Sequence, residues 1–415
     1  MEYGDLKYVH FHRKLGDDPI EELKMGLAWK TSESVNLLLG QKGCGKSTEL
    51  RRLKGMLEET GFEVFLCDME GYINKTEPLE VGDVLISIMG AMSDAMEERF
   101  GSGFGLDYWS RMTKFLSQDV NIEQISLIGP GFNLKASLLR NPDFKEALRK
   151  RLRLYPSEMT NQAWKFASEM VDRVRQQTNS PNKQVVLLVD SLEKQQGVGQ
   201  EKTLAVYDSM KRLFTADAHA LSIPKIHMVY SIPPYLPALT PNMGSELSGA
   251  ALFRLPSVHV LYQAGTPDNR GLDVMKEVVE KRFAQWQTIF TSDQMSSLAA
   301  ASGGDFRAFF RMIQRCLTKG ASRGDPLPFS DDIIYRAQAD YKSEFLPIAK
   351  DDARWLLKIA ASKKVELEQH NLLSTLARFL DGKLVLNYRN GNDWYDVHPL
   401  LKEEIRAILG DEARG

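Results

Sequence analysis

Nine consecutive residues near the N-terminus combine glycines, a lysine and hydroxyl side chains in the spacing G-x-x-x-x-G-K-[ST], which is typical of a loop that binds phosphate. They read Gly40-Gln41-Lys42-Gly43-Cys44-Gly45-Lys46-Ser47-Thr48. Glycines let the backbone curl so that several N–H groups point at one phosphate, and a helix beginning there adds the positive end of its dipole. Lys46 can reach the terminal phosphates, and Ser47 offers a hydroxyl to Mg²⁺. The motif predicts a site for a nucleoside triphosphate with Mg²⁺, built from Gly40, Gly43, Cys44, Gly45, Lys46, Ser47 and Thr48.

A carboxylate that suits the same Mg²⁺ ends the apolar run at residues 184–190, whose last member is Asp190. Such a run predicts a buried parallel strand, and ligands bind at the C-terminal edge of parallel sheets. Asp190 is therefore predicted to hold Mg²⁺ together with Ser47. Glu193 is the nearest further carboxylate that could orient an attacking water. The alternative is that Glu193 caps a helix or pairs with a cation.

The elements that must position these residues are visible in the hydrophobic pattern. An apolar strand at 35–39 precedes the loop, and residues 49–57 after it have helical spacing. Further strands are predicted at 62–68, 184–190, 225–231 and 257–261. About 115 residues separate the second strand from the third, far more than one crossover helix needs, so this stretch is read as an insertion. The insertion is predicted to contain helices at 81–100, 107–117 and 157–177 and a β-hairpin over 124–136.

The phosphate loop together with Asp190-Ser191-Leu192-Glu193 resembles the AAA+ and STAND-type P-loop ATPases. The resemblance implies an α/β fold with a parallel sheet, ATP and Mg²⁺ as cofactors, and ATP hydrolysis. Most AAA+ motors carry glutamate directly after the aspartate, whereas this chain has Ser191 there. The departure leaves Glu193 as the residue for the catalytic role. If Glu193 does not take that role, we expect slow hydrolysis and a protein that behaves as a nucleotide-dependent switch.

The same resemblance implies three further contacts with nucleotide. Ser231, at the end of the 225–231 strand, matches a polar residue that contacts the γ-phosphate. Arg254, before the predicted fifth strand, matches an arginine aimed at the nucleotide of a neighbouring subunit, a cation that lowers the barrier to phosphoryl transfer. Arg307, in the run Ser302-Gly303-Gly304-Asp305-Phe306-Arg307, resembles the second sensor of a helical lid. The alternatives are that Ser231 is an ordinary serine at a strand end, that Arg254 is a surface arginine and that Arg307 pairs with a carboxylate within the lid.

The sequence beyond the fifth strand predicts a helical lid and then a winged helix like those of the origin-recognition ATPases. The predicted domains are a core at 1–262, with its insertion at about 80–180, a lid at 263–347 and a winged helix at 348–415. Residues 350–415 hold 11 Lys and Arg against 11 Asp and Glu, which favours docking to protein over DNA. A basic run at 149–153 is interpreted as a solvated helix face or, alternatively, as a surface that binds phosphates or an acidic partner.

Composition and net charge limit which partners and which cellular location the sequence favours. The formal net charge is -2, so nothing global favours nucleic acid or an anionic membrane, and three scattered cysteines fit a reducing cytoplasm. No apolar run approaches the roughly 20 residues that span a bilayer. The leading prediction is a cytoplasmic ATP-dependent oligomeric switch that acts with a partner protein, in stress or anti-phage signalling. The alternatives are a DNA-loading or transposition-type ATPase and a scaffold that holds nucleotide without hydrolysing it.

Overall fold

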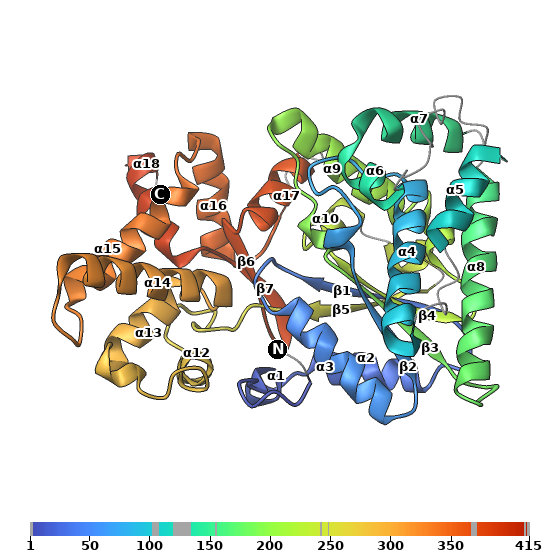
Figure 1. Ribbon diagram of the computed structural model, residues 1–415. Helices are drawn as coiled ribbons and strands as arrows, with labels where there is room; N and C mark the ends of the chain where they lie inside the picture. Colours follow the sequence, from blue (N-terminus) through green and yellow to red (C-terminus); the bar gives the residue numbers. More distant parts are fainter. Residues whose placement is uncertain are drawn as a thin grey trace. The chain divides into compact units, whose positions relative to one another are not determined.

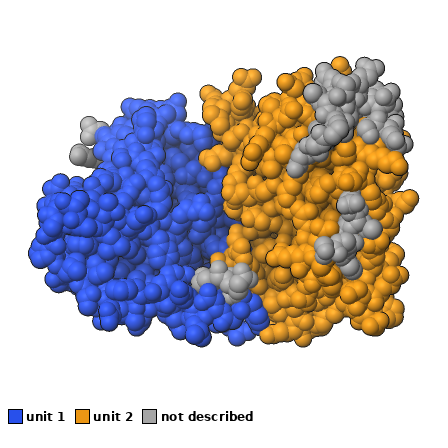
Figure 2. Space-filling model, in the orientation of Figure 1, with its two compact units in different colours: residues 1–19, 40–46, 254–415 blue, residues 20–39, 47–253 orange. Residues whose placement is uncertain are grey.

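The computed structural model describes residues 3–101, 108–118, 134–153, 156–240, 243–247, 249–366, 372–410 and 412. The chain divides into two compact units (Figure 2). Unit 1 comprises residues 1–19, 40–46 and 254–415, and unit 2 comprises residues 20–39 and 47–253. Over the described residues, no helix is both long and apolar enough to cross a membrane.

A five-stranded sheet in the order β2-β3-β4-β1-β5 forms the centre of the α/β part (Figure 1). Its β2–β3, β3–β4 and β1–β4 pairings are all parallel. Every residue of β1, β3 and β4 is buried, which explains why these strands appear in the sequence as continuous apolar runs. The strands are β1 (Ser34–Gly40), β2 (Glu63–Asp68), β3 (Val185–Asp190), β4 (Ile226–Ile232) and β5 (Ala251–Leu255). The predicted fold class, an α/β parallel sheet of the P-loop type, is confirmed.

Helices account for most of the rest of residues 20–253. In unit 2, α4 packs on β2 and against the long helix α8. The helices are α2 (Pro19–Ala28), α3 (Lys46–Glu59), α4 (Val81–Phe100), α5 (Tyr108–Gln118), α6 (Leu134–Arg140), α7 (Pro142–Leu152), α8 (Pro156–Gln177), α9 (Gln200–Leu213), α10 (Leu236–Leu239) and α11 (Met243–Glu246). The predicted insertion helices are confirmed to within a residue. The predicted hairpin over 124–136 lies mostly outside the described residues, but its last three residues, 134–136, belong to α6 and are not a strand.

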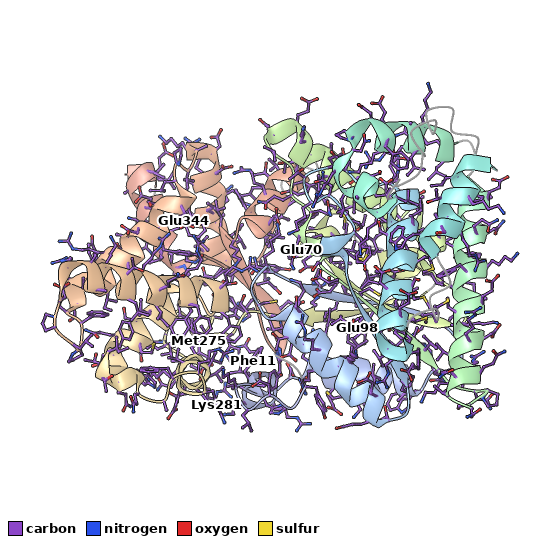
Figure 3. The ribbon with its side chains drawn as sticks, in the orientation of Figure 1. Phe11, Glu70, Glu98, Met275, Lys281 and Glu344 are labelled. Atoms are coloured by element: carbon purple, nitrogen blue, oxygen red, sulfur yellow. The ribbon has the colours of Figure 1, made fainter. Side chains whose placement is uncertain are left out.

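Unit 1 has a helical core built from residues near the N-terminus and from residues 258–341. Phe11 and Met275, both labelled in Figure 3, belong to one buried cluster together with Phe309. The helices that build it are α1 (Phe11–Leu15), α12 (Asn269–Glu280), α13 (Ser292–Ala301), α14 (Phe306–Arg323) and α15 (Asp331–Lys342). The Thr291 side chain caps α13 in a capping box with Gln294.

The end of the chain, where a winged helix is predicted, forms two helices, a hairpin and a last helix. Strands β6 (Val385–Asn390) and β7 (Asn392–Val397) pair antiparallel around Gly391. The helices are α16 (Lys350–Ser362), α17 (Leu373–Asp381) and α18 (Lys402–Leu409). The boundaries of the three predicted domains stay a prediction.

The predicted fifth strand at 257–261 is wrong, because β5 lies earlier, at Ala251–Leu255. The apolar residues Val258 and Val260 instead pack into the helical core of unit 1. The backbone there bonds to helix ends: the Val258 N–H donates to the Gly304 carbonyl at 3.3 Å, and the Asp268 N–H donates to the Val260 carbonyl at 2.9 Å. Residues 257–260 are thus all buried, and they form backbone hydrogen bonds without joining the sheet.

Candidate nucleotide-binding site

The predicted site residues fall into two groups. Residues 40–46, Arg254 and Arg307 belong to unit 1, whereas Ser47, Thr48, Asp190, Glu193 and Ser231 belong to unit 2. Lys46 and Ser47 are neighbours in the chain, so a covalent bond joins the two groups.

In unit 1 the phosphate loop follows β1 and leads into α3, as the motif requires. The Lys46 ammonium is buried and donates to the Gly40 carbonyl at 2.6 Å and to the Gln41 carbonyl at 2.9 Å. Gly43 and Gly45 adopt φ of 95° and 107°, left-handed values that favour glycine. The loop therefore curls around the lysine and holds it with its own carbonyl groups.

Arg307 lies against this loop. A Cβ placed on Gly43 would stand 2.8 Å from the Arg307 Cβ and 2.9 Å from a carboxylate oxygen of Asp305. The other oxygen of Asp305 accepts the Ala308 N–H at 2.7 Å and caps α14. The cap fixes the first turn of α14, and this turn brings Arg307 to the loop with an exposed side chain.

In unit 2 the hydroxyl of Ser47 donates a hydrogen bond to the carboxylate of Asp190, which ends β3. Asp190 is buried, and burial together with the nearby charge of Glu193 raises the pKa of its carboxyl, against the opposing effect of the bonds from Ser47 and the Ser191 N–H. Thr48 follows in the first turn of α3 and is half-buried. A hydroxyl beside a carboxylate is a pair of hard oxygen donors that fits Mg²⁺. No cluster of three or more His, Cys, Asp or Glu ligands occurs among the described residues.

The chain turns sharply after Asp190 and brings Glu193 to Ser231. Ser191 has φ of 73°, a value that a residue with a side chain rarely adopts. The short 3₁₀ turn Leu192–Lys194 follows, and the Ser231 hydroxyl on β4 donates to a carboxylate oxygen of Glu193 at 2.6 Å. Both side chains are buried. The structure thus places the two residues predicted for water activation and γ-phosphate contact in direct contact with each other.

Arg254 lies within β5 rather than before the fifth strand. Its guanidinium pairs with the Asp393 carboxylate on β7 at 3.0 Å, and both side chains remain about a quarter exposed. Over the described residues, no hydrogen bond or ion pair joins Arg254 to the phosphate loop, and its role toward a neighbouring subunit stays a prediction.

Two contacts that the sequence does not predict join the loop to the C-terminal segment of unit 1, one made by Gln41 of the loop and one by Lys383 of that segment. Gln41 is buried, and its amide donates to the Leu380 and Val385 carbonyls at 3.1 and 2.7 Å. The Lys383 ammonium lies 3.1 Å from the position of a Cβ on Gly43. More than 330 residues separate these partners in the chain, and no local pattern marks them.

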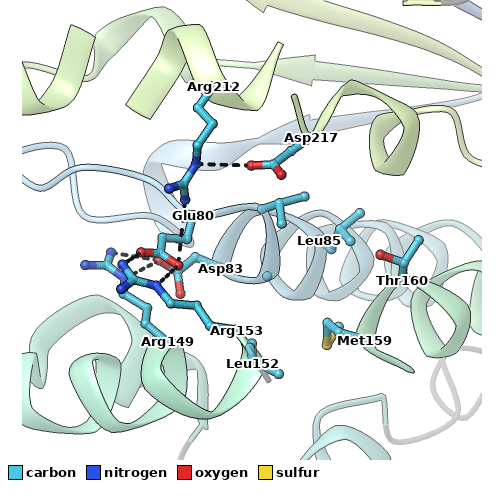
Figure 4. Close-up of a pocket in the computed structure, with 12 residues that line it drawn as sticks. Glu80, Asp83, Leu85, Arg149, Leu152, Arg153, Met159, Thr160, Arg212 and Asp217 are labelled. Carbon is cyan, nitrogen blue, oxygen red and sulfur yellow. Dashed lines mark hydrogen bonds and ion pairs between the residues drawn. The ribbon is translucent and has the colours of Figure 1, made fainter. Parts of the chain in front are cut away.

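A cavity of about 460 Å³ in unit 2 lies apart from the predicted site residues (Figure 4). Its charged lining is paired internally: Arg149 binds Asp83 at 2.7 Å, Arg212 binds Asp217 at 3.3 Å, and Arg153 binds Glu80. None of the predicted nucleotide contacts lines it.

The sequence matches no protein-family model and no curated protein. Among solved structures it is similar to the ORC2 protein of Aeropyrum pernix, determined as ADPNP–ADP complexes, with 10% identity over 99% of this chain and 98% of that chain and a TM-score of 0.45. It is similar to Cdc6p of Pyrobaculum aerophilum, with 13% identity, coverage of 98% and 95% and a TM-score of 0.39. It is also similar to the Walker-type ATPase PABY2304 of Pyrococcus abyssi, with 14% identity, coverage of 94% of both chains and a TM-score of 0.41.

Likenesses this distant do not assign a function, so the functional argument depends on the residues of this chain.

Proposed function

We propose that this chain binds ATP with Mg²⁺, hydrolyses it slowly, and acts as an oligomeric switch with a partner protein. The observation that carries the proposal is the hydrogen bond from the Ser47 hydroxyl of the phosphate loop motif to the buried Asp190 carboxylate at the end of β3. A hydroxyl and a carboxylate held side by side at the start of a helix and the end of a parallel strand are the two protein ligands that a phosphate-bound Mg²⁺ requires. A role in stress or anti-phage signalling rests on the resemblance alone.

Each residue has a defined task in this proposal. Backbone N–H groups of residues 43–46 and the start of α3 bind the phosphates, and Lys46 exchanges its two loop carbonyls for phosphate oxygens. Ser47 and Asp190 hold Mg²⁺, which, when bound, neutralises charge that develops on the phosphates. Arg307 adds a cation from the start of α14.

Glu193 is proposed as the group that orients the attacking water. Its carboxylate is held by the Ser231 hydroxyl, so Ser231 positions it for accepting a proton. Ser191 occupies the place of the usual glutamate, so the carboxylate reaches the site only through the strained turn at 191. An indirect placement of this kind supports slow turnover.

The DNA-binding alternative depends on arginines that are paired within the chain. Arg149 binds Asp83 and the Pro78 carbonyl, and Arg153 binds Glu80. Arg378, the one arginine of α17, binds Asp352 at 2.7 Å. Cations neutralised in this way contribute less to phosphate contacts, which supports a protein partner over duplex DNA.

Calorimetry on the nucleotide-stripped full chain tests the proposal. ATP with Mg²⁺ is expected to bind the wild-type chain, and Lys46→Ala is expected to lose at least about 100-fold in affinity, because a buried charge-assisted contact disappears. Lys54→Ala, a half-exposed lysine of the same helix, is the matched control and is expected to bind like wild type. Absence of binding by the well-folded wild type would refute the nucleotide site.

A further inference from the structure

A further cation lies at the phosphate loop besides Lys42, Lys46 and Arg307. Lys383 lies two residues before β6, at φ of 59°, and its ammonium comes within 3.1 Å of a Cβ placed on Gly43. The same position on Gly43 is 2.8 Å from the Arg307 Cβ. Arg307 and Lys383 thus converge on the middle glycine of the loop from distant parts of the sequence.

The Lys383 ammonium is held there by one buried carboxylate. It donates to Asp305 at 2.8 Å, and the Asp305 side chain is fully buried. Burial, followed by the charge of Arg307, lowers the pKa of Lys383, against the opposing effect of Asp305. A desolvated ammonium is costly, and a single carboxylate that also caps a helix compensates it only in part.

Arg307 and Lys383 differ in how their charges are compensated. Among the described residues no carboxylate pairs with Arg307, whereas Lys383 pairs with Asp305, and Lys42 on the loop pairs with Asp381 at 2.8 Å. An exposed guanidinium and a desolvated ammonium beside the same glycine attract a polyanion, and a triphosphate is one.

Gln41 fixes the segment that carries Lys383. Its amide group donates to the Leu380 and Val385 carbonyls, and its oxygen accepts the Asn387 N–H at 3.3 Å. These backbone partners lie on both sides of Lys383 in the chain, so the second residue of the phosphate loop holds the whole turn between α17 and β6 in place.

We propose that Lys383 is a phosphate-contacting residue of the nucleotide site, supplied by the C-terminal segment and positioned by Gln41. The inference rests on the proposed function and extends it, because it makes the C-terminal segment part of the site. Since binding linkage is reciprocal, a nucleotide that engages Lys383 stabilises the docked segment, and a docked segment strengthens nucleotide binding. The nucleotide state can thereby be transmitted to the end of the chain.

Titration of the nucleotide-stripped full chain with fluorescent ATP, ADP and AMP analogues tests the proposal. Lys383→Asn is the variant, because asparagine tolerates the left-handed backbone at this position. We expect about a tenfold loss of ATP affinity, with a smaller loss for AMP, since a charge-assisted contact to the outer phosphates is removed. Lys402→Asn, a lysine that pairs with Asp396 elsewhere in the C-terminal segment, is the control and is expected to bind ATP like wild type.

A double variant separates direct contact from neutralisation of Asp305. Asp305→Asn keeps a side chain that can cap α14, and Asp305→Asn with Lys383→Asn removes both charges. If Lys383 contacts phosphate, the double variant binds ATP about tenfold more weakly than Asp305→Asn alone. Equal affinity of these two variants, or wild-type affinity of Lys383→Asn, would overturn the inference. Failure of the folded wild type to bind any nucleotide would instead overturn the proposed function.

Discussion

At the residue scale, the strained turn after β3 decides where the Glu193 carboxylate lies. Ser191 adopts its left-handed conformation between a buried strand and a 3₁₀ turn, and its N–H donates to Asp190 at 2.8 Å. Such strain persists where surrounding contacts determine the backbone, and it concentrates at functional sites. Here it delivers Glu193 to the Ser231 hydroxyl rather than to solvent.

Glu193→Gln tests this arrangement. The amide keeps the volume and a hydrogen bond to Ser231 but cannot accept a proton, so ATP hydrolysis is expected to fall by about 10²-fold or more while ATP affinity stays within a few fold of wild type. Phosphate release and nucleotide titration measure the two effects. Glu201→Gln, on the exposed start of α9, is the control. Turnover unchanged in Glu193→Gln would move the base to another residue.

At the element scale, the turn between α13 and α14 positions Arg307 and depends on Gly304. Its φ is 76°, and a Cβ there would meet the Val258 carbonyl oxygen at 1.7 Å. Val258 and Gly304 are also joined by a backbone hydrogen bond. The close approach of two backbones at this point leaves no room for a side chain.

Gly304→Ala is therefore expected to destabilise the protein by about 3 kcal/mol or more, from left-handed strain and backbone displacement together. Gly324→Ala is the control, because its φ is 68° but its Cβ would meet nothing within 4 Å, so strain alone should cost about 1 kcal/mol. Chemical unfolding of both variants measures the difference. Equal destabilisation would show that the contact with Val258 relaxes without cost.

The sequence predicted those elements whose signal is local. Apolar runs gave β1, β3 and β4, and helical spacing gave α4 and α8, because burial of a strand or of one helix face is recorded directly in residue order. The strand predicted at 257–261 is wrong for the same reason. Apolar residues indicate that a segment is buried but not by which kind of element, and the helical core of unit 1 buries Val258 and Val260 as a sheet would.

The candidate site was predictable to the same extent. Glycine spacing marked the phosphate loop, and the end of an apolar run marked Asp190. Gln41 and Lys383 carried no signal, because their significance comes from contacts between segments more than 330 residues apart. The roles of all these residues remain predictions.

At the scale of the whole molecule, one buried histidine makes stability depend on pH. Burial, followed by the charge of Lys383, lowers the pKa of His398 to about 3. Neither ring nitrogen has a hydrogen-bond partner among the described residues, and the ring packs beside Phe345. The unfolded chain binds a proton below about pH 6.5 and the folded chain does not, so stability must fall as the pH drops from that value toward 3.

His398→Leu is expected to remove this contribution. Between pH 7 and pH 5 the free energy of unfolding of wild type should fall by about 2 kcal/mol more than that of the variant. Denaturant unfolding at the two pH values measures the difference, and His219→Leu, at an exposed position, is expected to retain the full wild-type dependence. Parallel pH dependence of wild type and His398→Leu would show that His398 is not buried as a neutral ring.

At the same scale, substitutions of Arg254 and of its partner Asp393 test whether ATP turnover depends on assembly of several copies. Arg254 forms the ion pair with Asp393 at 3.0 Å, and the sequence predicts for it, as an alternative use, a contact with nucleotide held by a neighbouring copy. Because both side chains are about a quarter exposed, the pair contributes at most about 1 kcal/mol and can open at little cost. Arg254→Ala removes both uses, whereas Asp393→Asn removes only the ion pair.

If Arg254 acts between copies, Arg254→Ala lowers ATP turnover by up to about 10³-fold in assembled protein and leaves dilute, monomeric protein unchanged. Asp393→Asn then turns over ATP at least as fast as wild type, because its arginine is released. Turnover measured across a concentration series, with the assembly state followed by light scattering, separates the cases. Equal loss in both variants, or a loss in Arg254→Ala that is independent of concentration, would restrict Arg254 to its own chain.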